Sequence, residues 1–163
     1  MKLLKTIKDK NLSENFRTRE ASRAVLFDRD NLIPLLFVSK YNYHKLPGGG
    51  LEGKENKIQA LTREIKEEAG CVAKIGKEIG KVIEYRSEFN LKQTSYGYLG
   101  KVLTRGEQDF TKKEKKEGFE LIWVSLDEAI KMVKKDKPTN YEGKFIKRRD
   151  LAFLIEAKKS DNS

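Results

Sequence analysis

The chain has 163 residues, of which 37% are hydrophobic and 37% charged, and its apolar residues fall in discrete runs. This length fits one domain with a buried core, and the runs exclude disorder along the whole chain. The net charge of +10 favours an anionic partner (a nucleotide, RNA, DNA or an acidic membrane surface) unless it only aids solubility, and the single cysteine, Cys71, excludes an internal disulfide.

The first segment, residues 1–20, is polar and predicts either a lead-in strand or a loose tail. It lacks the apolar stretch of a signal peptide, and no later segment is apolar enough to span a bilayer. We therefore expect a cytoplasmic protein with no membrane partner. Residues 24–27 (AVLF) and 32–38 (LIPLLFV) predict two β-strands joined by a turn, with Pro34 at an edge or a bulge.

A glycine-rich turn, PGGG at residues 47–50, precedes the clearest predicted helix. The apolar residues of this helix are spaced by three and four positions and so share one face. They are Ile58, Leu61, Ile65 and Ala69. Gly70 follows as the predicted helix stop.

Residues 71–103 alternate apolar and polar side chains, interrupted by Gly76, Gly80 and Gly97, which predicts several antiparallel strands. The charged segment at residues 104–118 (TRGEQDFTKKEKKEG) predicts a mobile loop. Residues 121–124 (LIWV) predict the last strand.

Two helices are predicted near the end of the chain. Ser125 caps the first, with Glu128 at its third position, in a capping-box pattern. The second runs over residues 141–158, before a loosely ordered polar tail at residues 159–163. No repeat or linker divides the chain, so residues 1–163 are predicted to form one α+β domain.

The central predicted helix carries clustered acids. Glu64 and Glu68 lie on one face with Glu67 beside them, and Arg63 can pair with Glu67. Such carboxylates suit Mg²⁺ or Mn²⁺, which complete their coordination with substrate phosphates, and two ions can clamp a diphosphate and activate water. The alternative is an ordinary solvated helix face in a chain rich in Lys and Glu.

The spacing around these acids is specific. Gly49 is followed after five residues by Glu55, and after seven more by REIKEEAGC at residues 63–71. This resembles the signature of the Nudix hydrolases, glycine-x5-Glu-x7-Arg-Glu-U-x-Glu-Glu-x-Gly-U, where U is aliphatic. Cys71 departs from the aliphatic last position, and we expect it to pack as a small buried residue.

The resemblance implies a fold, a reaction and a set of roles. The fold is an α/β/α sandwich around a mixed sheet, and the reaction is hydrolysis of a nucleoside diphosphate linked to another group, by water attack at phosphorus with Mg²⁺ or Mn²⁺. By position, the implied metal ligands are Glu64, Glu67 and Glu68. Arg63 orients one of these glutamates and, with Glu67 and Glu68, forms the implied catalytic set.

Three further signature positions have structural roles by resemblance. Gly49 permits the turn, Glu55 is the structural acid at the front of the helix, and Gly70 ends it. Outside the signature, Glu117 or Glu120 stands where some relatives draw an extra ligand or general base. The alternative for both is a loop acid facing water.

Candidate substrate contacts precede the signature. Arg23, at the mouth of a predicted strand, is placed to reach a phosphate or to form a surface salt bridge. Tyr41, Tyr43 and His44 are placed to stack on a base or to form an ordinary surface cluster.

Two rival interpretations concern the glycine-rich turn and the fold's activity. A P-loop fits Gly48-x4-Gly53-Lys54, but Glu55 replaces the Ser or Thr that holds Mg²⁺ and would repel phosphates, which excludes it. A non-catalytic nucleotide- or RNA-binding protein of the same fold stays open, although every acid of the signature is present. We expect a MutT-like nucleoside triphosphate-type substrate, with ADP-ribose, nucleotide sugars, dinucleoside polyphosphates and RNA 5′ ends as alternatives, and we make no prediction of oligomeric state.

Overall fold

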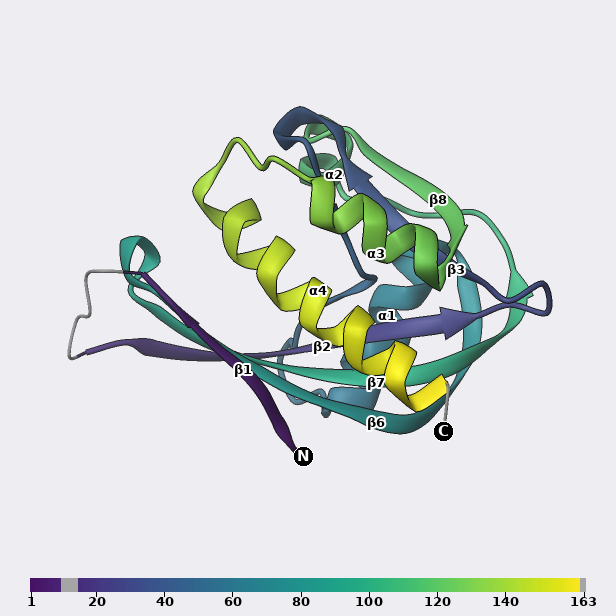
Figure 1. Cartoon of the computed structure of the whole chain (residues 1–163), viewed down its shortest axis with the longest axis horizontal. Helices are drawn as coiled ribbons and strands as arrows, with labels where there is room; N and C mark the ends of the chain where they lie inside the picture. Colours follow the sequence, from purple (N-terminus) through teal and green to yellow (C-terminus); the bar gives the residue numbers. More distant parts are fainter. Residues whose placement is uncertain (10–14, 162–163) are drawn as a thin grey trace.

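The computed structural model describes residues 1–9 and 15–161, so residues 10–14 of the expected lead-in lie outside the described residues. The described chain forms two sheets and four α-helices (Figure 1). The larger sheet has the strand order β1-β6-β7-β2-β5, and the smaller has the order β4-β3-β8.

The elements have the following bounds. The strands are β1 (Leu3–Lys8), β2 (Arg17–Phe27), β3 (Leu32–Val38), β4 (Tyr43–Lys45), β5 (Gly48–Gly50), β6 (Cys71–Arg86), β7 (Leu91–Arg105) and β8 (Phe119–Ser125). The helices are α1 (Lys57–Ala69), α2 (Lys112–Lys116), α3 (Leu126–Lys135) and α4 (Tyr141–Asp161), with 3₁₀ turns η1 (Ser39–Tyr41) and η2 (Ser87–Phe89).

The larger sheet is mixed and covered on both faces. β1 runs parallel to β6 and β2 parallel to β7, whereas β6–β7 and β2–β5 are antiparallel. Side chains of β7 alternate between the faces: Tyr98 packs with Leu61 and Ile65 of α1, and a side chain at Gly97 would meet Phe153 of α4. Figure 1 shows α1 behind the strands and α4 in front of them. The predicted α/β/α sandwich with a mixed sheet is confirmed.

The smaller sheet explains Pro34. β4 pairs only with the last three residues of β3, while Pro34 lies opposite Trp123 of β8. At Pro34, β3 therefore has a partner on one side only among the described strands, as at the edge of a sheet. The predicted edge position is confirmed.

Of the two alternatives for residues 1–20, the described residues show strand, and the strands predicted over residues 71–103 are fewer and longer than expected. The described parts of residues 1–20 include β1 and the start of β2 at Arg17, and Ile7 of β1 is buried in the core, which explains why this segment is not a loose tail. The expected strand breaks at the glycines are also absent, because β6 and β7 are long strands that absorb them in register shifts around Glu78 and Gly80.

The predicted mobile loop at residues 104–118 and the predicted loose tail are also corrected. The loop region begins as strand β7 and contains α2, where Thr111 and Glu114 cap each other's main-chain N–H groups. α4 continues to Asp161, so of the predicted tail only residues 162–163 lie outside the described chain. Among the helices described, none has an apolar stretch sufficient to cross a bilayer.

Helix α1 matches its predicted bounds. Asn56 and Gln59 form a capping box at its start, and Gly70 ends it with φ of 66°, a left-handed conformation that favours glycine. Leu61, Ile65 and Ala69 are buried as expected, but Ile58 is 42% exposed, and Ala60 takes its place against the sheet.

Candidate active site

Three carboxylates converge at one end of α1. One oxygen each from Glu64, Glu68 and Glu114 lies within 4.8 Å of the others. Glu64 and Glu68 are one turn apart on α1, whereas Glu114 comes from α2. Like charges this close repel one another, so the cluster is suited to a bound cation.

The glycine strand β5 gives this cluster its room. A Cβ atom at Gly49 would collide with the carboxylate of Glu64, so glycine allows the main chain to pass directly beside the acids. On the other face of β5, the corresponding space beside Gly50 holds the guanidinium of Arg19. The glycine strand is therefore a thin wall between acids on one side and an arginine on the other.

Arg63 is the centre of the acid network. Its Nε and Nη2 donate to the two carboxylate oxygens of Glu55 at 2.8 and 3.0 Å, and its Nη1 donates to Glu64 at 2.9 Å. Nη2 also donates to the carbonyl of Gly50 at 3.1 Å. The bidentate contact with Arg63 lowers the pKa of Glu55 to about 2. Arg63 thus ties the front of the helix, one cluster acid and the glycine strand together.

Glu68 is the buried member of the cluster. Its side chain is 1% exposed, it accepts the N–H of Gly48 at 2.8 Å, and Lys45 Nζ lies 3.4 Å from its other oxygen. Burial raises the pKa of Glu68 to about 7, against the lowering effect of Lys45. A cation bound at the cluster would favour the ionised form of this carboxylate.

The segment that carries the glycines is fixed from the α4 side. Asp150 accepts the N–H of Leu46 at 2.9 Å, and Arg23 Nη1 donates to the carbonyl of Gly48 at 2.6 Å. Both side chains are buried. Because these contacts hold β5 from behind, α4 contributes to the position of the acid cluster without touching it.

A second polar group lies on the α4 face of the larger sheet, and we call it the arginine cluster: Arg19, Arg86, Glu84, Gln93 and Glu142. Arg19 donates to Gln93 at 2.7 Å, Gln93 donates to Glu84 at 3.2 Å, and Arg86 donates to Glu84 at 2.8 Å. Arg86 also contacts Glu142 of α4 at 3.4 Å. Burial alone would raise the pKa of Glu142, but Arg86 and Lys45 outweigh it and keep the pKa below its usual range.

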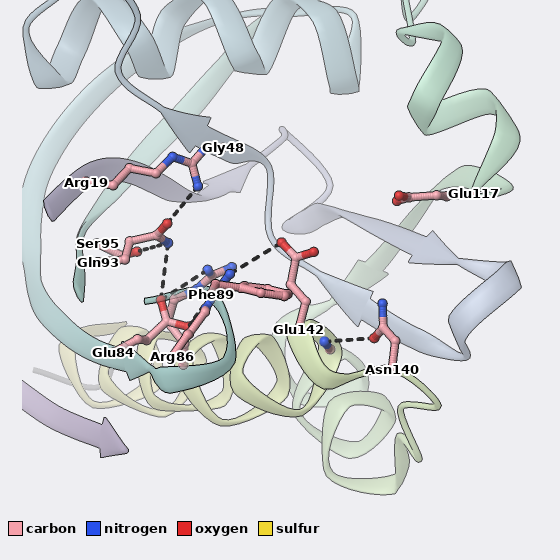
Figure 2. Close-up of polar contacts among 12 residues, drawn as sticks. Arg19, Gly48, Glu84, Arg86, Phe89, Gln93, Ser95, Glu117, Asn140 and Glu142 are labelled. Atoms are coloured by element: carbon pink, nitrogen blue, oxygen red, sulfur yellow. Dashed lines mark hydrogen bonds and ion pairs between the residues drawn. The ribbon is translucent and has the colours of Figure 1, made fainter. Parts of the chain in front are cut away.

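Figure 2 shows the arginine cluster facing a space that Glu117 enters from the opposite side. Asn140 borders the same space, with its side chain accepting the N–H of Gly143 at 2.9 Å. Phe89 of η2 lies beside Arg86 and Glu142, and its side chain is 40% exposed. The space therefore combines cations, hydrogen-bonding groups and an exposed aromatic ring.

The structure places the predicted acids differently from one another. Glu64 and Glu68 enter the oxygen cluster, but Glu67 lies outside it, 35% exposed and 3.5 Å from Arg63. Glu117 follows α2, is 20% exposed and lies 3.8 Å from Lys113. Glu120 is exposed on β8. Of the two, Glu117 is the one that Figure 2 shows facing the polar space.

The predicted substrate contacts Arg23, Tyr43 and His44 are not at the surface. Arg23 is 4% exposed and holds the glycine strand, so it forms no surface salt bridge. Tyr43 is 3% exposed and packs with Val38 and Ile146. His44 is partly buried, lies 2.8 Å from Asp136 and packs against the ring of Phe37.

Sequence reasoning missed Glu114, Arg19 and Phe89. For Glu114 a signal was present, because Thr111 followed three residues later by Glu114 is a capping-box pattern and predicts a helix rather than a mobile loop. Arg19 lies near the start of β2 and Phe89 in η2, just before the parallel partner strand β7, and no local pattern connects them.

The residues at the cluster fit a divalent metal ion. Three carboxylates supply the oxygen ligands that hard cations prefer, and buried Glu68 has the charge of Lys45 3.4 Å away. A metal held by Glu64, Glu68 and Glu114 would supply positive charge that polarises a phosphate and lowers the pKa of a coordinated water.

Comparisons with known proteins give the family and the fold of the chain. A family model described as NUDIX domain matches residues 17–147. Diphosphoinositol polyphosphate phosphohydrolase 3-beta of Homo sapiens is 30% identical over 133 residues, which cover 79% of this chain and 76% of that protein. Two solved structures share the fold. The NUDIX hydrolase from Nitrosomonas europaea has a TM-score of 0.62 at 19% identity, covering 89% of this chain and 90% of that one. An ADP-ribose pyrophosphatase from Streptococcus suis has a TM-score of 0.55 at 22% identity, covering 86% and 92%.

Proposed function

The chain belongs to the Nudix hydrolase family, enzymes that act on phosphoric anhydride bonds, and we propose that it is a Mg²⁺-dependent pyrophosphohydrolase of nucleoside diphosphate derivatives. The first substrate class we propose is the MutT-like one, a nucleoside triphosphate-type molecule. The observation that carries the proposal is the oxygen cluster of Glu64, Glu68 and Glu114 beside the glycine strand. Mn²⁺ would serve the same ligands.

The chain's own residues have distinct roles in this reaction. Water attacks one phosphorus, the bridging oxygen leaves with the other phosphate, and one proton must be accepted. We assign the proton to Glu117, because it faces the polar space, rather than to exposed Glu120. Arg63 keeps Glu64 in position, and Lys45 and Arg19 offer positive charge on either side of β5. Glu67, at the rim of the cluster, is kept as a further proposed ligand.

The chemical groups around the space beside the arginine cluster suit a nucleoside. Phe89 presents an exposed ring on which a base can stack, and ionised Glu142 can accept N–H groups from a base edge. Arg19, against the glycine strand, lies where phosphates would pass from the acids to this space.

A diphosphoinositol polyphosphate is the second candidate, because relatives about 30% identical carry that name. A ring with phosphates on most of its carbons would need cations on every side. Here Glu84, Glu117 and Glu142 bring carboxylates into or beside the same space, so the charge pattern favours a nucleoside.

The test is phosphate-product release from a substrate panel with Mg²⁺ or Mn²⁺, comparing the wild type with Glu68→Gln. The panel contains nucleoside triphosphates, ADP-ribose, nucleotide sugars, diadenosine polyphosphates, triphosphorylated RNA and diphosphoinositol polyphosphates. We expect metal-dependent cleavage of a nucleoside derivative that Glu68→Gln abolishes. Cleavage of diphosphoinositol polyphosphate alone would overturn the substrate class, and full activity of a folded Glu68→Gln variant would overturn the assigned site.

A further inference from the structure

A groove lies between β1 and α4, away from the acid cluster. It consists of two adjoining cavities of about 540 and 330 Å³, which share Arg148 of α4 in their lining. β1 forms one wall and a single stripe of α4 forms the other, with the start of β1 near the end of α4, as the contact of Lys2 with Glu156 shows. We call this the β1–α4 groove.

The walls of the groove are basic. Its exposed cations come from both elements: Lys2, Lys5, Lys8, Lys144, Arg148 and Lys159. Three acids also line it. Asp9 accepts hydrogen bonds from Ser87 and Tyr141, and Glu156 pairs with Lys2 and Lys159. The third acid, Glu88, is exposed. Within residues 1–9 and 15–161, no acid pairs with the other four cations. These four are Lys5, Lys8, Lys144 and Arg148.

Apolar side chains alternate with these cations. Leu3 is 48% exposed and Ile155 is 37% exposed, and both line the smaller cavity. At the other end, Tyr141 lines the larger cavity and contacts the exposed ring of Phe89 edge-on, with ring centroids 5.1 Å apart. Exposed apolar side chains that lie together with polar residues around them mark interaction sites more often than single scattered ones do.

We propose that the β1–α4 groove binds single-stranded nucleic acid, with its phosphodiester backbone on the lysines and arginine and its bases against the apolar side chains. Single strands are bound in this way, by a basic channel that follows the backbone and by apolar or aromatic surfaces for the bases. From Lys144 to Lys159 the α4 wall is about 22 Å long at the helical rise per residue, enough for several nucleotides.

The shape and charge of the groove favour this ligand over an anionic membrane. A bilayer surface meets flat or protruding faces, whereas Arg148 and Lys144 line recessed cavities that a flexible strand can enter. The proposal does not depend on the proposed catalytic function, because none of the groove cations belongs to the acid cluster or the arginine cluster.

The experiment measures binding of a fluorescent single-stranded oligonucleotide of about 12 nucleotides with a 5′-hydroxyl end, by anisotropy in EDTA. Under these conditions no metal and no terminal phosphate engage the acid cluster. The groove variant is Lys8→Gln, Lys144→Gln, Arg148→Gln. The matched control is Lys131→Gln, Lys134→Gln, Lys135→Gln, which removes three exposed charges from α3. Melting temperatures establish that both variants are folded.

We expect the groove variant to bind at least about tenfold more weakly, and the slope of log affinity against log salt to fall by about 2 for three lost contacts. The control should stay within about twofold of the wild type, after the small effect of net charge. RNA and DNA of one sequence distinguish recognition of the sugar from recognition of the backbone alone, and either result supports the proposal.

Two results would overturn it. An equal loss of affinity in the control variant would mean that the oligonucleotide responds only to net charge. Binding to phosphatidylserine vesicles that is lost in the groove variant, with no oligonucleotide binding by the wild type, would assign the groove to a membrane instead.

Discussion

The acid cluster and the arginine cluster lie on opposite faces of β5 and differ in charge, because the first gathers three carboxylates whereas the second balances two arginines with two glutamates. On the α1 side, Gly49 makes room for Glu64, and three carboxylates lie close enough together to bind one cation. On the α4 side, Gly50 makes room for Arg19, and Arg86 pairs there with Glu84 and Glu142. This difference explains why β5 is rich in glycine. Because the strand has no side chains, carboxylates for a metal can lie close to one face and Arg19, which can contact a phosphate, close to the other.

The largest expected effect comes from removing a carboxylate of the acid cluster. Glu68→Gln removes a buried cluster carboxylate, and its activity should fall by more than the 10- to 100-fold typical of residues that only support metal ligands. The free energy of unfolding without metal should change little or increase, because a repelling charge is removed from the core. Turnover assays and thermal melting check both parts.

The matched control is Glu120→Gln, which removes an exposed carboxylate from β8. It should retain activity. Comparable losses in the two variants would contradict the special position of Glu68.

The next prediction concerns the close approach of Gly49 in β5 to the carboxylate of Glu64. Gly49→Ala places a methyl group against the carboxylate of Glu64, so we expect a 10- to 100-fold fall in activity, similar to loss of support for a metal ligand. Gly76→Ala is the control, because its Cβ would make only ordinary contact with the carbonyl of Leu99 at 3.5 Å. Equal activity of the two alanine variants would refute the close-approach argument. Kinetics with saturating Mg²⁺ provide the measurement.

The two sides also differ in how far the sequence predicts them. On the acid side, the signature lies within 23 residues, on one helix and its preceding turn, where periodicity predicts that Glu64 and Glu68 share a face. Two residues differ from that prediction: Glu67 lies outside the oxygen cluster, and Glu114 enters it from α2 through tertiary packing. The arginine side draws on β2, β6, β7 and α4, and its neighbours depend on strand register, such as Arg19 opposite Gln93. Register across a parallel pair has no local signal, so Arg19 and Phe89 were not predicted.

Packing also explains the predicted contacts that moved inward. Arg23 was expected at a strand mouth, but β5 pairs with that part of β2, so the side chain is covered and its guanidinium holds the carbonyl of Gly48. Tyr43 is covered by the start of α4, as the close approach of Gly143 to its ring shows. Neither covering element is adjacent in the sequence.

The pH dependence of metal binding sharpens the contrast at Glu68. Burial raises the pKa of Glu68 to about 7, above the unfolded value, so the protonated form is favoured in the metal-free protein. The contribution of protonated Glu68 to the free energy of unfolding is therefore present at low pH and is lost as pH rises toward 7. Metal must displace the proton, so apparent Mn²⁺ affinity should weaken about tenfold per pH unit below 7 and level off above it.

Titration of Mn²⁺ without substrate at several pH values measures this dependence. Glu68→Gln should bind more weakly and lose most of the slope between pH 6 and pH 7, since no proton is displaced from that position. The same slope in the variant would assign the proton to another group, such as Glu67, whose pKa burial also raises.

The smallest expected effect concerns Phe89, which lies beside the arginine cluster. If a base stacks on the exposed ring of Phe89, Phe89→Ala should raise KM for a nucleoside substrate about fivefold or more, equivalent to about 1 kcal/mol, the lower end for one stacked base. The value of kcat should change less, because Phe89 lies at the base end and not at the acids. Phe89→Tyr keeps a ring and should keep KM near the wild-type value. A change in kcat alone, or an equal rise of KM for a substrate with no base, would mean that Phe89 acts only through its packing on Tyr141.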